Sequence, residues 1–262
     1  MQPMTGFVTT EDRARVRWLT MSNPGRMNAV PPDGWDELAD AFAAFGRSEA
    51  RVLVVTGAGG DFCSGADMNK DVSGVPSAAD NAARMRKTNR AALALHRLAK
   101  PTIARIDGVA VGAGMNLAIG CDVAIASDSA RFAEIFAKRG LTLDFGGTWL
   151  LPRLVGLARA KELALTGRVF GAQEAVKIGL VSESVPADVL DERVTAVAES
   201  LADGAPLAQS MIKRALDRSS SMTFEQSLSF EEQGQAILLA SEDLAEGSAA
   251  FVAKRQPDFK GR

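Results

Sequence analysis

The segment Arg51-Val52-Leu53-Val54-Val55-Thr56 runs directly into Gly57-Ala58-Gly59-Gly60-Asp61-Phe62-Cys63-Ser64-Gly65-Ala66-Asp67. A short and almost wholly apolar run is typical of a strand that is buried on both faces of a parallel sheet. The glycines that follow permit tight turns and let the backbone approach another group closely. The sequence therefore predicts a buried strand over 51–56 and a loop at its carboxyl end that can bring main-chain atoms to a ligand.

The same arrangement of a buried strand followed by a glycine-rich turn recurs further along the chain. We expect strands over 102–106, 122–126 and 131–136, glycine-rich loops over 107–114 and 140–147, and a short helix over 115–120. The residues before this region predict a hairpin with arms at 7–10 and 16–19, a helix over 32–45 and a helix over 78–99. Strands therefore alternate with helices through the first half of the chain.

The remainder of the chain, after about residue 150, is predicted to be mostly helical. Alternating strands and helices followed by helices alone predict the α/β class with a helical C-terminal region. We expect residues 1–200 to form the α/β core and 201–262 to form the helical region of the same structural unit, because no low-complexity linker separates them.

Composition and charge exclude several classes of protein. The chain has 262 residues, a formal net charge of -2 and 47% hydrophobic residues. This charge balance provides no large positive field, so we expect no nucleic-acid partner. No apolar run is long enough for a transmembrane helix and Met1–Phe7 does not resemble a signal peptide, so we expect a cytoplasmic protein without a membrane partner. His96 is the only histidine, and we expect no metal site.

Taken together, the three glycine-rich loops and their flanking residues resemble the crotonase superfamily, the enoyl-CoA hydratase/isomerase family. The resemblance runs from Asn23-Pro24-Gly25-Arg26-Met27-Asn28-Ala29 to Ala250-Phe251-Val252-Ala253-Lys254-Arg255. It implies the ClpP/crotonase-like spiral of ββα units, with a helical C-terminal region that drives trimers, often paired into hexamers. It also implies an acyl-CoA substrate and no separate cofactor, since coenzyme A enters only as part of the substrate.

The resemblance also implies which residues form the site. The family stabilises a thioester enolate with two backbone N–H groups, which by position are those of Ser64 and Ala113; the second lies just before the predicted short helix, whose N-terminal end favours negative charge. The positions that line coenzyme A are Arg26, Met27, Ala66, Asp67 and Met68, together with Phe251 and Lys254 reaching over from a neighbouring subunit. The implied acyl pocket comprises Asn116, Phe136, Leu143, Phe145 and Trp149.

The sequence departs from the hydratase pattern at both acid/base positions. The two hydratase glutamates are replaced here by Asn116 and Phe136. Addition of water to an enoyl thioester needs one group to deprotonate the water and another to protonate the α-carbon. Asn116 can orient a water but accepts no proton at neutral pH, and Phe136 can do neither. These replacements argue against simple hydration.

A carboxylate is present instead at Asp144, in Leu143-Asp144-Phe145-Gly146-Gly147-Thr148. Aspartate at this turn resembles the isomerase branch of the family, and the surrounding residues are most similar to the phenylacetate-pathway epoxyacyl-CoA isomerases. A different interpretation is that Asp144 caps a helix that starts near Gly147. For Glu134, strand alternation places it on one face with residues 132 and 136, and we expect a solvated charge at the edge of the strand.

Three functional hypotheses follow. The first is an isomerase that converts 3-enoyl-CoA to 2-enoyl-CoA, with Asp144 moving one proton and with neighbouring phenylalanines raising its pKa. The second is an enoyl-CoA hydratase in which Glu134 or Asp144 replaces the missing pair. The third is a homologue that binds acyl-CoA without turning it over.

Overall fold

The computed structural model describes residues 6–68 and 77–262; residues 1–5, which belong to the segment judged not to be a signal peptide, and residues 69–76 lie outside it. A six-stranded sheet runs in the order β1-β2-β3-β4-β6-β9, and a three-stranded sheet runs in the order β5-β7-β8. In the larger sheet only β1 and β2 pair antiparallel, and the other neighbours are parallel. The chain is thus an α/β protein, as the sequence predicts.

The strands and helices have the following bounds in the described residues. The strands are β1 (Val8–Arg13), β2 (Val16–Met21), β3 (Val52–Gly57), β4 (Thr102–Ile106), β5 (Val109–Val111), β6 (Val123–Ser127), β7 (Arg131–Ala133), β8 (Phe170–Gly171) and β9 (Glu183–Val185). The helices are α1 (Gly34–Gly46), α2 (Ala78–His96), α3 (Ala113–Ile119), α4 (Gly147–Val155), α5 (Leu157–Thr166), α6 (Ala172–Lys177), α7 (Leu190–Ala202), α8 (Pro206–Ser219), α9 (Phe224–Leu239) and α10 (Glu242–Ala253), with short 3-10 helices η1 (Ile135–Arg139) and η2 (Ala187–Val189).

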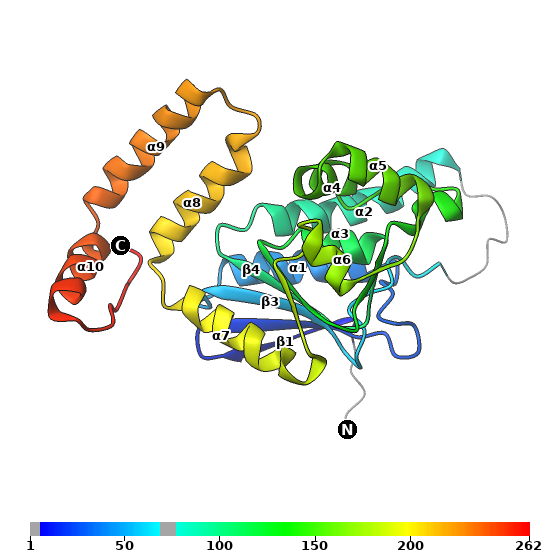
Figure 1. Cartoon of the computed structure of the whole chain (residues 1–262), viewed down its shortest axis with the longest axis horizontal. Coiled ribbons are helices and arrows are strands. Elements are labelled where there is room, and N and C mark those ends of the chain that lie inside the picture. Colours follow the sequence, from blue (N-terminus) through cyan, green and yellow to red (C-terminus); the bar gives the residue numbers. More distant parts are fainter. Residues whose placement is uncertain (1–5, 69–76) are drawn as a thin grey trace.

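The apolar run that predicts the buried strand packs on both sides of the larger sheet. Leu53 and Val55 of β3 belong to the main core, with residues of α1 and α2, whereas Val52 and Val54 belong to a second core against α7. Alternate side chains of a strand point to opposite faces, so an unbroken apolar run requires a cover on each face. Figure 1 shows α7 on one side of the sheet and the other core helices on the opposite side.

Helices α8, α9 and α10 stand away from the two-sided core (Figure 1). None of the residues of α8 or α9 is buried. The link to the core includes an ion pair between Lys213 of α8 and Asp122 at 2.7 Å. The helical C-terminal region thus begins after α7, which itself belongs to the core.

Several element boundaries differ from the sequence prediction. The segment Glu11–Arg13, expected as the hairpin turn, belongs to β1, and the chain turns at Ala14, which has a φ of 51°. The strand expected over 131–136 ends at Ala133, because its partner β5 ends where Gly112 turns the chain with a φ of 57°. The short helix expected over 115–120 begins at Ala113, and the helix expected over 78–99 ends at His96.

Candidate active site

The first two glycine-rich loops lie side by side. The Cys63 N–H donates to the Val109 carbonyl at 2.8 Å, and the Val111 N–H donates to the Cys63 carbonyl at 3.0 Å. Gly114 allows this approach, because a Cβ at residue 114 would lie 2.2 Å from the Cys63 carbonyl oxygen. Heavy atoms cannot come so close, so any side chain at Gly114 would separate the loops.

The structure corrects one of the two predicted oxyanion donors. The Ser64 N–H already donates to the Met27 carbonyl at 2.9 Å, so it is not available to a substrate oxygen. Two residues later, the Ala66 N–H donates no hydrogen bond within residues 6–68 and 77–262, and the same is true of the Ala113 N–H. The Ala66 N–H could not be singled out as a donor from the sequence, because an unpaired backbone N–H leaves no mark in the residue type.

The geometry around Gly65 brings the Ala66 segment next to Ala113. Gly65 has a φ of +96°, and a Cβ built on it would lie 3.5 Å from the Ala113 nitrogen and 3.1 Å from the Val111 oxygen. On its other side the segment pairs with Val30, through Val30 N–H to Gly65 oxygen and Asp67 N–H to Val30 oxygen. The Ala66 N–H therefore faces away from Val30, on the side where Ala113 lies.

The predicted coenzyme A residues gather around the same loop. Hydrogen bonds from Ser64 to the carbonyls of Arg26 and Met27 hold the two segments together. Arg26 and Asp67 form an ion pair at 4.0 Å, and Met27 and Met68 are both exposed. Arg26, Met27, Ala66, Asp67 and Met68 thus share one surface beside the loop, and their contact with coenzyme A stays a prediction.

Asp144 lies in a turn that leaves its carboxylate free. Phe145 and Gly146 follow with φ angles of 49° and 82°, and α4 has Gly146 as its N-cap with no side-chain capping bond. The Asp144 Oδ1 atom is buried without a hydrogen-bond partner in the part of the chain that is described. The capping interpretation is therefore wrong. Burial raises the pKa of Asp144 to about 6, in the direction that the sequence predicts.

Glu134 lies at the end of β7 and is not a solvated charge. The side chain is 0% exposed, and neither carboxylate oxygen has a hydrogen-bond partner within the described ranges. Burial and, to a smaller extent, the charge of the nearby Asp144 carboxylate together raise the pKa of Glu134 to about 8, against an opposing effect of the Asn116 side chain. The expectation of a strand-edge charge is wrong because β7 ends at Ala133 and Glu134 begins the turn into η1 with a fully buried side chain.

Asn116 connects these parts of the site. It lies on α3, one turn after Ala113, and its Nδ2 donates to the Asp144 carbonyl at 3.0 Å. Its Oδ1 is buried without a partner among the described residues. Its side chain also lowers the pKa of Glu134. Gly147 allows α4 to approach, since a Cβ there would lie 2.4 Å from the Asn116 Nδ2. Asn116 thus fixes the Asp144 turn relative to the helix that carries the Ala113 N–H.

The residues predicted to form the acyl pocket differ from one another in their surroundings. Phe136 lies beside the loop, since its ring would be 3.6 Å from a Cβ on Gly112. Leu143 is half-buried, and Phe145 is buried in the main core against Trp35, with ring centroids 5.7 Å apart.

Trp149 lies in a groove apart from Asp144 and Phe136. Its ring contacts His96 and the Arg153 guanidinium, which lies 3.9 Å from the ring centroid. It lines a groove between α4 and α8 that does not include Asp144 or Phe136. The assignment of Trp149 to the acyl pocket stays a prediction.

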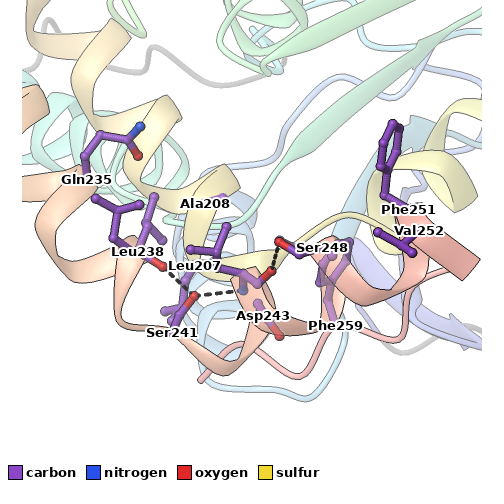
Figure 2. Close-up of a pocket in the computed structure, with 14 residues that line it drawn as sticks. Leu207, Ala208, Gln235, Leu238, Ser241, Asp243, Ser248, Phe251, Val252 and Phe259 are labelled. Atoms are coloured by element: carbon purple, nitrogen blue, oxygen red, sulfur yellow. Dashed lines mark hydrogen bonds between the residues drawn. The ribbon is translucent and has the colours of Figure 1, made fainter.

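Phe251 and Lys254 lie at the end of α10, in the C-terminal region that stands away from the core (Figure 1). Phe251 is 85% exposed and lies next to Val252 beside an apolar groove that α8, α9 and α10 form (Figure 2). Within one chain, neither residue lies near Asp144 or Ala66. Their predicted role requires a second copy of the chain, as the sequence expectation states.

No group of three or more His, Cys, Asp or Glu side chains within residues 6–68 and 77–262 is arranged to hold a metal ion. No helix in the same ranges combines the length and apolarity needed to cross a membrane. Cys63 and Cys121 are both buried free thiols, and burial raises the pKa of each to about 12, so neither is an activated nucleophile.

Comparison with known proteins gives matches over almost the whole chain. Residues 11–262 match the family model described as enoyl-CoA hydratase/isomerase. The 1,2-epoxyphenylacetyl-CoA isomerase of Escherichia coli is 36% identical over 99% of this chain and 100% of its own length. The 2,3-dehydroadipyl-CoA hydratase of the same organism is 37% identical over 95% of this chain and 96% of its own length.

A solved structure supports the same relationship at the level of the fold. The crystal structure of a putative enoyl-CoA hydratase from Streptomyces coelicolor superposes with a TM-score of 0.93 at 35% identity, covering 100% of this chain and 97% of that one. The glycine-rich loops and their two unpaired N–H groups are consistent with the family that the full-length matches indicate. The chain therefore belongs to the enoyl-CoA hydratase/isomerase family and has the crotonase fold.

Proposed function

We propose that this protein is an acyl-CoA double-bond isomerase that converts a 3-enoyl-CoA into the conjugated 2-enoyl-CoA. The observation that carries the proposal is the Asp144 carboxylate, which is partly buried and caps no helix. The backbone carbonyl of Asp144 accepts from Asn116, which fixes this turn relative to the helix of Ala113. The hydratase positions 116 and 136 hold Asn116 and Phe136, which supply no acid/base group. The relative named as an isomerase matches the full chain and supports the same conclusion.

The N–H groups of Ala66 and Ala113 would hold the thioester oxygen. Removal of a C2 proton places negative charge on that oxygen, and preorganised backbone donors stabilise it without further rearrangement. The main chain supplies both donors, so their position depends on the glycines that set the loops rather than on side chains.

Asp144 would act as the base that takes the C2 proton. A base must be ionised to accept a proton, and a pKa near 6 leaves Asp144 ionised at neutral pH while making it a stronger base than an exposed aspartate. An allylic shift needs no water as a third reactant. This is consistent with the absence of a hydratase-type pair at residues 116 and 136.

The proposal is tested by assaying the purified protein on cis-3-hexenoyl-CoA and on crotonyl-CoA side by side, and by following the absorbance of the conjugated thioester. We expect rapid appearance of that absorbance with the first substrate and little loss with the second. Hydration of crotonyl-CoA faster than isomerisation of the hexenoyl thioester would establish the hydratase instead. Binding of both thioesters without turnover would establish an acyl-CoA-binding homologue.

We also propose that the chain assembles as a trimer, or as a hexamer of two trimers. Helices α8 to α10 expose large apolar side chains that one chain leaves uncovered, among them Ile212, Leu216, Phe224, Ile237, Leu239 and Phe251. Exposed apolar surface of this extent marks an interface. Light scattering of the purified protein is expected to give three or six times the chain mass of 27.6 kDa. A mass equal to one chain would contradict the assembly.

A further inference from the structure

Among the residues that the structure describes, Glu134 is the one fully buried carboxylate that the proposed reaction leaves without a role. Its two oxygens have no hydrogen-bond partner in the described ranges, although a buried polar group without a partner costs free energy. Two neighbours affect the pKa of Glu134: the charge of the Asp144 carboxylate raises it, and the Asn116 side chain lowers it. Glu134 also follows directly after Ala133, whose carbonyl accepts from the Gly112 N–H beside the oxyanion donor Ala113.

A neutral, protonated Glu134 would explain why buried oxygen atoms of Glu134 and Asn116 have no hydrogen-bond partner among the described residues. Asn116 already uses its Nδ2 on the Asp144 carbonyl, and its Oδ1 is an acceptor without a donor in the part of the chain described. A protonated Glu134 provides an O–H donor, whereas a carboxylate only accepts. Two like charges in one buried site also oppose each other, which favours one ionised and one protonated carboxyl group.

On the basis of the proposed function, we propose that Glu134 is a second catalytic residue, the acid that delivers a proton to C4 of the acyl chain while Asp144 removes the proton from C2. When the C2–H bond breaks, its proton goes to Asp144 and its electron pair forms the dienolate held by Ala66 and Ala113. The dienolate then takes the Glu134 proton at C4, the C2–C3 double bond forms and the C3–C4 double bond is lost.

The site returns to its starting state by one proton transfer. After the reaction Asp144 is protonated and Glu134 is ionised, and the proton passes from Asp144 to Glu134 directly or through solvent. The environments favour this direction, because the pKa of Glu134 is raised to about 8 and that of Asp144 to about 6. A pair of carboxyl groups with separated pKa values is the usual arrangement for one base and one acid in the same site.

The origin of the C4 hydrogen distinguishes this reaction from proton return by Asp144 alone. Enzyme equilibrated in D2O is mixed in excess with cis-3-hexenoyl-CoA for a single turnover, and the 2-enoyl product is analysed by NMR. We expect deuterium at C4, because the Glu134 proton has exchanged with solvent. Protium at C4 would overturn the role of Glu134. Absence of any 2-enoyl product would instead show that the proposed isomerase function is wrong, and the role of Glu134 would fall with it.

A variant with matched shape provides the second measurement. Glu134→Gln keeps the side-chain volume but has no acidic proton, and Glu199→Gln on the exposed face of α7 is the control for removal of a glutamate. For Glu134→Gln we expect kcat to fall at least ~10²-fold with KM nearly unchanged. For the wild type we expect the rate to fall above about pH 8, and in Glu134→Gln this loss should disappear. Wild-type kcat with an unchanged alkaline limb in Glu134→Gln would overturn the proposal, whatever the isotope result.

Discussion

Replacing Asp144 with alanine or asparagine is expected to lower kcat for 3-enoyl-CoA isomerisation by at least ~10²-fold, because general acid–base catalysis by one group contributes about 10²–10⁴. Asparagine keeps the shape of the turn and the carbonyl that accepts from Asn116. The fold should therefore remain, and circular dichroism checks that it does. Asp128→Asn removes an exposed carboxylate outside the site and should leave kcat within a few-fold of the wild type.

The same assignment predicts how the rate depends on pH. The pKa of Asp144 is raised to about 6 by burial, and the ionised form is the active one. The rate of isomerisation should therefore be low at pH 5, rise through about pH 6 and reach a plateau near pH 7. A rate that stays constant between pH 5 and pH 7 would contradict Asp144 as the base.

Gly65→Ala is expected to have the second large effect, a loss of roughly 10²-fold in kcat, the size associated with one oxyanion donor. The new Cβ would lie 3.1 Å from the Val111 oxygen and 3.5 Å from the Ala113 nitrogen, and the φ of +96° disfavours any residue other than glycine. The two N–H groups of Ala66 and Ala113 would move apart, while Asp144 would keep its position.

Gly59→Ala is the matched control for backbone strain in the same loop. Gly59 also has a positive φ, of +73°, but a Cβ there meets no atom within 4 Å. It should lower the melting temperature without a comparable loss of kcat. Equal losses of kcat in the two variants would show that loop strain, rather than the oxyanion donors, explains the effect of Gly65→Ala.

The sequence was sufficient to predict the parts of the fold that depend on local patterns. The apolar run at Val52–Val55 predicts a strand covered on both faces, and the structure places α1 and α2 on one face and α7 on the other. Boundaries that depend on a partner strand were harder to predict. The strand expected to continue to Phe136 ends at Ala133 because β5 ends at Val111, and this limit is set by a segment more than twenty residues earlier.

The parts of the candidate site that depend on a particular side chain could be predicted from the sequence. The parts that depend on backbone N–H groups could not. Asp144 is recognisable because a carboxylate at a glycine-rich turn is visible in the sequence. The Ala66 N–H is identifiable only from which amides remain unpaired, and Ser64 is excluded by its bond to Met27. The burial of Glu134 depends on tertiary packing, although the phenylalanines that flank it in the sequence, at residues 132 and 136, were a signal of it.

The most direct test of the account is the initial rate at which conjugated thioester absorbance appears when cis-3-hexenoyl-CoA is mixed with the wild type and, in parallel, with Asp144→Asn at pH 7.5. We expect rapid formation of the 2-enoyl thioester by the wild type and a rate at least ~10²-fold lower for the variant. Equal rates in the two proteins, or no conjugated product with the wild type, would contradict it.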